Sequence, residues 1–513
     1  MKFLTNRKII GFFALILLIT LTLEAATYNR TERPNVLFIM SDDHTTQAIG
    51  VYGSRLAKLN PTPNIDALAR AGMKFDRVYC NNSICTPSRA SIITGQYSQS
   101  NGVLDLKGQI SPDKQYLPLE MKKVGYEAAI IGKWHLKKEP AAFDYYCVMP
   151  GQGEYYNPYF RIQGDKPWPK NVIQKSGMHS SDAITDISLE WLKNGRDRQK
   201  PFFLMHHFKA PHDMFINAKR YDKYLEDVTI PEPTNLFDPP AGSDGSRNMG
   251  SGVGRKHAPW RLAKKLQISE KLNDRDYAKA GYQKYLKRYL RCVKGIDDNV
   301  KRLIDYLKET GELNNTVIIY TSDQGFFLGE HDLMDKRWMY EEAFRMPFIV
   351  HAPRLSKAGT TNHWLINNTD FAPTILDLAG VEETPEYIQG RSFADALEGK
   401  AKPSNWRTST YYRYWMHMAH NLAVPAHFGI RSERHKLVFF YGCTPEGKNN
   451  TPVAWEFYDL EKDPQEMHNL YSSPEYGKVI AEMKAELKRT RVNLNETDEK
   501  YPNIQAIIEA NWN

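Results

Sequence analysis

The sequence has little of three features that would each identify a class of protein. Its 513 residues include only five scattered cysteines, too few for a disulfide-stapled scaffold. It has no dense block of basic residues with interleaved aromatics, so nucleic acid is not an expected partner. Its longest apolar run falls short of the roughly 20 residues that a membrane-spanning helix needs, so stable membrane insertion is not expected either.

That apolar run, Ile9 to Leu23, has the features of an export signal. It follows the charged residues Lys2, Arg7 and Lys8 and precedes Ala25-Ala26, where small residues allow cleavage. We therefore predict a signal peptide over residues 1–26 and an exported mature protein, periplasmic or secreted. The formal net charge of +8 is mildly positive, which suits an anionic substrate.

The remaining composition is that of a globular protein, with 41% hydrophobic and 25% charged residues. A chain this long is expected to form two domains of unequal size. We predict a catalytic domain over residues 33–395 and a smaller α+β subdomain over residues 396–513. The second region has short runs typical of antiparallel strands, followed by a helical pattern from Ile480 to Leu487. These runs are Tyr411 to Tyr414, Phe428 to Ile430, Lys436 to Tyr441 and Glu456 to Asp459.

Four short apolar runs in the first region each end in polar residues. Such runs are typical of strands buried on both faces, as in a parallel sheet between helices. In open α/β sheets the functional site lies beyond the carboxyl ends of the strands. The sequence therefore predicts an α/β fold with a mostly parallel sheet. The runs are Val36 to Met40, Ala128 to Ile131, Phe202 to Met205 and Val317 to Tyr320.

Acidic residues follow the first and the last of these runs. Asp42 and Asp43 come after one, and Asp323 and Gln324 come after the other. Three carboxylates and an amide oxygen favour a hard cation, Ca²⁺ first and Mg²⁺ second. Either pair alone would more simply be a set of solvent-facing acids in a turn. Two such pairs at two strand ends favour a metal site.

A cysteine occupies a chemically distinct position in the segment from Ser83 to Gly95. Pro87 favours a first helical turn and Gly95 a helix stop, so Cys85 is expected at a helix N-terminus, where an anion is favoured. A buried structural cysteine is the alternative. The segment Cys85-Thr86-Pro87-Ser88-Arg89 and its continuation to Gly95 resemble the signature of the formylglycine-dependent sulfatase family.

This resemblance implies a modified nucleophile at position 85. Cys85 would be oxidised to formylglycine (3-oxoalanine) by a separate formylglycine-generating enzyme. One hydroxyl of its hydrate would attack sulfur, and the other would later expel sulfate. Arg89 would orient the hydrate, and the metal ligands would be Asp42, Asp43, Asp323, Gln324 and Cys85. Many family members have Asn where this chain has Gln324.

A second stretch, from Gly125 to His135, resembles the second signature of the same family, with Ala128 in place of the usual hydroxyl residue. The resemblance implies that Lys133 neutralises sulfate oxygens and that His135 is the base that helps to eliminate sulfate. It also implies that His212 is the acid that protonates the leaving alcohol and that Lys336 clamps the sulfate. Lys133, His212 and Lys336 would thus bind substrate as well as act in catalysis.

Two further segments, residues 321–347 and 458–464, resemble bacterial polysaccharide sulfatases. This implies an alkaline-phosphatase-like fold and a sulfated carbohydrate as substrate, either algal (ulvan, carrageenan or fucan) or glycosaminoglycan. A phosphate or phosphonate ester hydrolase of the same superfamily and a catalytically silent carbohydrate-binding protein are the alternatives. One polar-aromatic cluster is equally compatible with a sugar subsite and with domain packing. It comprises Tyr411, Tyr412, Arg413, Tyr414, His417, His420 and His427.

Overall fold

The structure, a computed structural model, describes residues 33–238, 245–246, 252–254 and 264–512. The predicted signal peptide lies outside the described residues. Within them, none of the helices combines the length and the apolar character that crossing a membrane requires.

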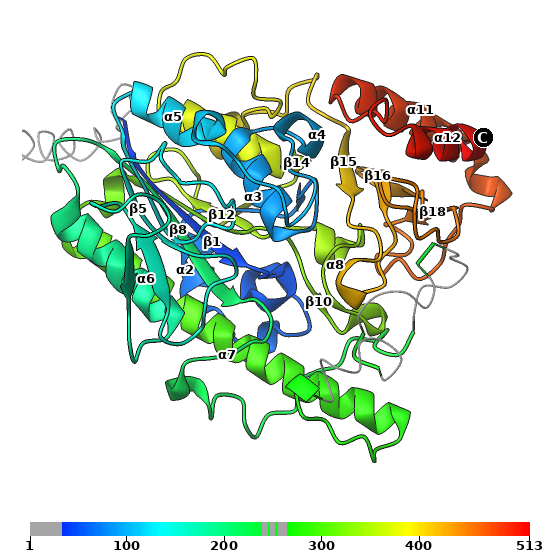
Figure 1. The fold of residues 1–513 in the computed structure, drawn as a ribbon, viewed down its shortest axis with the longest axis horizontal. Helices are drawn as coiled ribbons and strands as arrows, with labels where there is room; N and C mark the ends of the chain where they lie inside the picture. The colour runs from blue at the N-terminus through cyan, green and yellow to red at the C-terminus, as the bar shows by residue number, and fades with distance from the viewer. Residues whose placement is uncertain (1–32, 239–244, 247–251, 255–263, 513) are drawn as a thin grey trace, which may run out of the picture.

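The four apolar runs form the centre of a ten-stranded sheet (Figure 1). They are adjacent and parallel, in the order β9 (Thr316–Ser322), β1 (Asn35–Asp42), β8 (Phe202–Pro211) and β4 (Glu127–Lys133). Since parallel strands end at the same edge, the polar residues that follow these runs meet there. The mostly parallel α/β sheet predicted from the sequence is confirmed.

The outer strands make the sheet mixed. β12 (Phe348–His351) runs antiparallel to both β9 and β2 (Met73–Phe75), and β13 (Thr360–Asn362) closes that edge. At the other edge β5 (Tyr145–Met149) is parallel to β4, and β6 (Tyr159–Ile162) and β7 (Val172–Gln174) follow as antiparallel strands. Two small ladders join β10 (Phe327–Leu328) to β11 (Met334–Asp335) and β3 (Val78–Tyr79) to β14 (Ile366–Asn367).

Helices cover both faces of the sheet because alternate residues of each central strand point to opposite sides. Leu37 and Ile39 of β1 pack in one core with α2 (Pro63–Ala71), α6 (Ser180–Glu190) and α7 (Asp274–Glu309). Val36, Phe38 and Met40 pack in the other with α3 (Cys85–Thr94), α5 (Tyr116–Lys123) and α9 (Phe371–Leu378). The short helices are α4 (Ser98–Asn101), α8 (Glu341–Phe344) and α10 (Ala394–Leu397).

A separate four-stranded antiparallel sheet follows in the C-terminal region. Its order is β15 (Ser409–Tyr414), β16 (His427–Ser432), β17 (His435–Phe440) and β18 (Ala454–Asp459). One face packs on α11 (Gly477–Asn493) and α12 (Pro502–Asn511), which lie on its outer side in Figure 1. Residues of the other face, including Tyr412 and Val438, join the core of the large sheet. The smaller sheet and its helix are thus as predicted, while the boundary at residue 395 stays a prediction.

Candidate active site

Cys85 is the first residue of α3 and is only 1% exposed. Ile84 before it is extended, and Gly95 ends the helix with a left-handed φ of 65°. Ser88 ties the first turn to the end of β9 by donating to the carbonyl of Asp323, while Asn368 donates to Ser88 Oγ at 2.9 Å. The helix N-terminus, with its free backbone N–H groups, therefore points at the carboxyl edge of the sheet.

Three buried carboxylates meet beside this cysteine. Asp42 ends β1, Asp43 follows with a φ of 71°, and Asp323 follows β9. One oxygen from each lies within 4.8 Å of the others, and Asp42, Cys85 and His212 form a second group of that size. The Asp43 N–H donates to Asp323 Oδ1 at 3.1 Å, and the Gln324 amide donates to Asp43 Oδ1.

The oxygen atoms of this cluster fit a hard divalent cation. Asp42 Oδ1, Asp43 Oδ2 and Gln324 Oε1 are buried acceptors with no hydrogen-bond partner among the described residues, an arrangement that costs free energy unless a cation or water satisfies them. Burial raises the pKa of Asp43 to about 7 against the attraction of Lys336, and its two acidic neighbours add to the rise. Burial and the Asp42 charge also raise the pKa of Asp323 to about 6. A bound cation would relieve this repulsion, so Asp42, Asp43, Asp323 and Gln324 could hold Ca²⁺.

Three cationic side chains face the three carboxylates. Arg89 Nε donates to Asp323 Oδ2 at 3.0 Å, and its Nη2 lies 3.7 Å from Asp42 Oδ1. Lys133 Nζ pairs with Asp42, whereas Lys336 Nζ pairs with Asp43 and lies 3.2 Å from Cys85 Sγ. The opposing charges balance, so a divalent cation would make the site net positive, as an anionic sulfate ester requires.

The two predicted histidines are placed differently. His212 lies just past β8, with Nε2 3.8 Å from Asp43 Oδ2 and with Nδ1 donating to the Asp213 carbonyl at 2.7 Å. His135, with a φ of 57°, makes no hydrogen bond or ion pair with the other predicted residues, although it lies in the field of Lys133 and Asp42. Burial lowers the pKa of both imidazoles well below the usual value. Nine of the ten predicted residues thus form one contact network, and His135 stands beside it.

A cavity of about 220 Å³ opens above Cys85. Three predicted residues line it, Cys85, His212 and Lys336. Asp213, Asp335 and Arg337 were missed although each adjoins His212 or Lys336 in sequence, whereas nothing in the sequence pointed to Leu106, Gln152 or Leu422. The remaining lining residues are Ile84, Leu106, Gln152, His420 and Leu422.

Of the polar-aromatic cluster around β15 and β16, His420 alone lines this cavity. The other six members are buried. Arg413, for example, is 1% exposed and lies over the Trp415 ring, 3.5 Å from its centroid. Domain packing is therefore the role of all members except His420.

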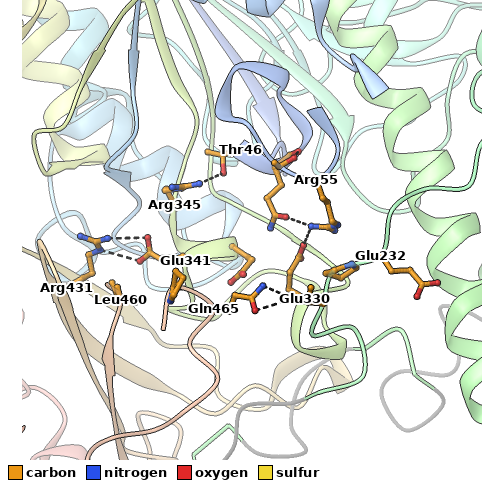
Figure 2. Close-up of a pocket in the computed structure, with 15 residues that line it drawn as sticks. Thr46, Arg55, Glu232, Glu330, Glu341, Arg345, Arg431, Leu460 and Gln465 are labelled. Atoms are coloured by element: carbon orange, nitrogen blue, oxygen red, sulfur yellow. Dashed lines mark hydrogen bonds and ion pairs between the residues drawn. The ribbon is translucent and has the colours of Figure 1, made fainter. Parts of the chain in front are cut away.

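A larger cavity of about 540 Å³ lies elsewhere and contains none of the predicted catalytic residues (Figure 2). Its guanidinium groups are already engaged: Arg55 pairs with Glu330, Arg431 with Glu341, and Arg345 donates to Thr46 Oγ1 at 3.2 Å. We therefore assign the chemistry to the smaller cavity above Cys85.

Comparison with known proteins agrees with this geometry. Residues 34–381 match the family described as Sulfatase. The chain belongs to the sulfatase family. It is therefore a sulfuric ester hydrolase with the sulfatase fold. Residues 329–493 of this sulfatase also match the family described as N-sulphoglucosamine sulphohydrolase, C-terminal.

Individual relatives extend the comparison. The N-acetylglucosamine-6-O-sulfatase of Bacteroides thetaiotaomicron is 39% identical to this sulfatase, covering 92% of this chain and 88% of its own. The ulvan-active sulfatase of Formosa agariphila is 27% identical, covering 88% and 78%. A solved structure of a protein in complex with its substrate D-glucosamine-2-N,6-O-disulfate is similar with a TM-score of 0.82 at 38% identity, covering 91% of this chain and 100% of that one.

Proposed function

We propose that this sulfatase removes 6-O-sulfate from a terminal N-acetylglucosamine or glucosamine residue of glycosaminoglycan-type oligosaccharides. The observation that carries the proposal is the small cavity above Cys85. At about 220 Å³ it is below the roughly 300–1,000 Å³ of sites for drug-sized ligands, so it suits one sulfated sugar ring rather than a polymer segment. Glucosamine derivatives are named both for the curated relative at 39% identity and for the solved structure at 38% identity, which supports this sugar over the algal ones.

Formylglycine at position 85 would supply the geminal hydroxyls that a cysteine lacks, one to attack sulfur and one to release sulfate. His212 Nε2 is directed to the carboxylate cluster by the Nδ1 hydrogen bond. In its imidazolium form, which the bound sulfate anion would favour against burial, His212 would give the Nε2 proton to the departing sugar oxygen. His135, whose Nδ1 has no hydrogen-bond partner in the described part of the chain, would accept the proton of the second hydroxyl. Lys133 and Lys336 would hold the sulfate oxygens. Ca²⁺ held by the carboxylates and Gln324 would add positive charge against the same anion.

The wall of the cavity offers a recognition pair for sugar hydroxyls. Arg337 Nε lies 3.2 Å from Asp335 Oδ2, and its Nη1 donates to the Tyr414 hydroxyl at 3.1 Å, so the guanidinium plane is fixed. A fixed guanidinium beside a carboxylate offers donors and an acceptor to vicinal hydroxyls. This pair would bind the unsulfated hydroxyls of the terminal ring and exclude a continuing chain there.

The test is a panel assay of sulfate release. The protein, co-expressed with a formylglycine-generating enzyme, is offered N-acetylglucosamine-6-sulfate, glucosamine-2-N,6-O-disulfate, and sulfated ulvan and carrageenan oligosaccharides. We expect release from the two glucosamine compounds and none by Cys85→Ala. Release from the algal oligosaccharides alone would overturn the sugar assignment. Cleavage of phosphonate esters without sulfate release would support the alternative hydrolase.

We also propose export through residues 1–26. Export would place the enzyme where extracellular sulfated glycans are accessible. Deletion of the apolar run is expected to leave the protein in the cytoplasm when cell fractions are compared. An unchanged distribution would contradict the proposal.

A further inference from the structure

A buried lysine that the proposed mechanism does not use lies next to the site. Lys209 is on β8 and is 4% exposed. Its Nζ donates to the Gln152 carbonyl at 3.1 Å and lies 4.6 Å from the centroid of the Tyr155 ring. Among the described residues, no carboxylate lies within ion-pair distance of it. Buried lysines without an acid partner are rare because desolvating the charge costs free energy.

Lys209 contacts the segment of residues 151–155 at both ends. Gly151 and Gly153, on either side of Gln152, have φ angles of 53° and 68°, which form a tight turn after β5. The Lys209 ammonium bonds to the turn at Gln152 and packs on the aromatic ring at Tyr155. The lysine thereby contacts the segment at both Gln152 and Tyr155.

This segment in turn contacts two predicted catalytic residues. Gln152 Oε1 accepts from Lys133 Nζ at 2.6 Å and lines the cavity. The Tyr155 hydroxyl donates to the main-chain carbonyl of His212. Lys133, which is expected to hold sulfate, and His212, which is expected to protonate the leaving group, therefore both contact this one segment.

We propose that Lys209 is a positioning residue of this sulfatase, which holds the 151–155 segment so that Gln152 orients Lys133 and Tyr155 orients His212. The inference rests on the proposed function for the roles of Lys133 and His212. Gln152 also lines the cavity, so it would lie beside a bound ligand.

The test compares Lys209→Met with Lys209→Arg. Methionine keeps the packing on Tyr155 but removes the donor to Gln152, so we expect kcat to fall about 10- to 100-fold with little change in KM, as for a misplaced reacting group. The melting temperature should be unchanged or higher, because an unpaired buried charge is removed. Lys209→Arg, which keeps a donor and a charge, should restore kcat to within about 5-fold of wild type.

A matched control is Lys74 on β2. Its Nζ donates to the Val51 carbonyl at 3.2 Å and lies 5.1 Å from the Tyr52 ring centroid, the same two kinds of contact. Three strands separate β2 from β8 in the sheet. Lys74→Met should leave kcat unchanged. This result would show that the fall in kcat of Lys209→Met comes from the position of Lys209 beside the 151–155 segment, and not from the loss of a lysine-tyrosine contact as such.

Gln152 variants test whether Lys209 acts on Lys133 through Gln152. Gln152→Ala should lower kcat like Lys209→Met, and the double variant should lose no more than either single one. Gln152→Glu would neutralise Lys133 and should raise KM at least about 10-fold. Additive losses, wild-type kcat in Lys209→Met, or a lower melting temperature with no rescue by arginine would each overturn the proposal.

A crystal structure of Lys209→Met gives a readout that does not depend on the substrate. We expect the 151–155 segment to shift and the Lys133–Gln152 contact to be lost, and retention of that contact would overturn the positioning role. A wild-type enzyme that is inactive on the glucosamine panel would instead contradict the proposed function. The two failures are thus distinguishable.

Discussion

Beneath the cavity, charged residues at the ends of three central strands belong to one network of contacts, whereas most of the residues that line its wall come from separate connections. Asp42, Lys133 and Asp323 end or follow β1, β4 and β9. Gln152 and His420, by contrast, lie between β5 and β6 and between β15 and β16. We define the floor as Asp42, Asp43, Cys85, Arg89, Lys133, Asp323, Gln324 and Lys336. The wall is Leu106, Gln152, Asp213, Asp335, Arg337, His420 and Leu422.

This difference separates the chemistry from the recognition of the sugar. The floor depends on the sheet, so its geometry changes only if the core changes. The wall depends on loops that vary without cost to the core. Floor substitutions should therefore affect every sulfate ester alike, while wall substitutions should affect only substrates with a sugar ring.

The largest expected effect is at the nucleophile. Cys85→Ala should lower sulfate release from all substrates by at least about 10³-fold, because the attacking group is removed. Its melting temperature should stay close to wild type, since the side chain is small. Rates on a glucosamine-6-sulfate and on an aryl sulfate are compared. Activity kept on one of them would break the distinction between floor and wall.

The next largest effect is expected at the carboxylates. Asp323→Asn removes the charge that Arg89 Nε contacts at 3.0 Å and one of the oxygens proposed for Ca²⁺. We expect kcat to fall about 10²- to 10³-fold, in line with the loss of a strong electrostatic group. Calcium titration by calorimetry should show weaker binding. Binding equal to that of wild type would contradict the metal assignment.

In the wall, Arg337→Lys should give a smaller and selective loss. Lysine keeps the charge but not the planar fork, so kcat/KM for the glucosamine-6-sulfate should fall about 10- to 100-fold. The aryl sulfate has no sugar hydroxyls and should be hydrolysed at the wild-type rate. Equal losses on both substrates would place Arg337 with the floor instead.

His420→Ala should have a smaller effect on activity. His420 reaches the cavity from the connection between β15 and β16. Losing one hydrogen bond to a neutral hydroxyl costs about 0.5–1.5 kcal/mol, which corresponds to a few-fold rise in KM. Sugar analogues that lack one hydroxyl at a time would show which group it contacts. If every analogue is affected equally, His420 does not contact the ring.

The smallest effect on activity is expected at Glu496, which lies outside both groups. Burial raises its pKa from 4.5 to about 7, and its carboxylate accepts from the Gln99 N–H at 2.7 Å. The folded state thus holds this proton more tightly than the unfolded state, so the contribution to stability is full below pH 4.5 and is lost as pH rises to 7. Glu496→Gln should reduce the change of melting temperature with pH between pH 4.5 and 7 without changing kcat. An unchanged slope would contradict the raised pKa.

The sequence predicted the floor better than the wall for physical reasons. The four central strands are continuous buried runs, so both their existence and the edge that their polar residues share were predictable. Strands such as β7 and β13 are three residues long and have no such signal. Residues 106, 152, 337 and 420 are far apart in sequence and meet only through the folded loops, so no spacing links them. His135 was placed by resemblance, and its role stays a prediction because the structure gives it no direct contact with the floor.

The burial of Cys85 has a consequence for timing. Cys85 is 1% exposed and its Sγ lies 3.2 Å from Lys336 Nζ, so a second enzyme would have little access to it once α3 has packed on the sheet. Conversion to formylglycine would therefore take place on the newly made chain, before folding is complete. A formylglycine-generating enzyme added to the folded protein would not convert Cys85. The fraction of chains that carry formylglycine would therefore depend on the rate of conversion relative to the rate of folding during synthesis.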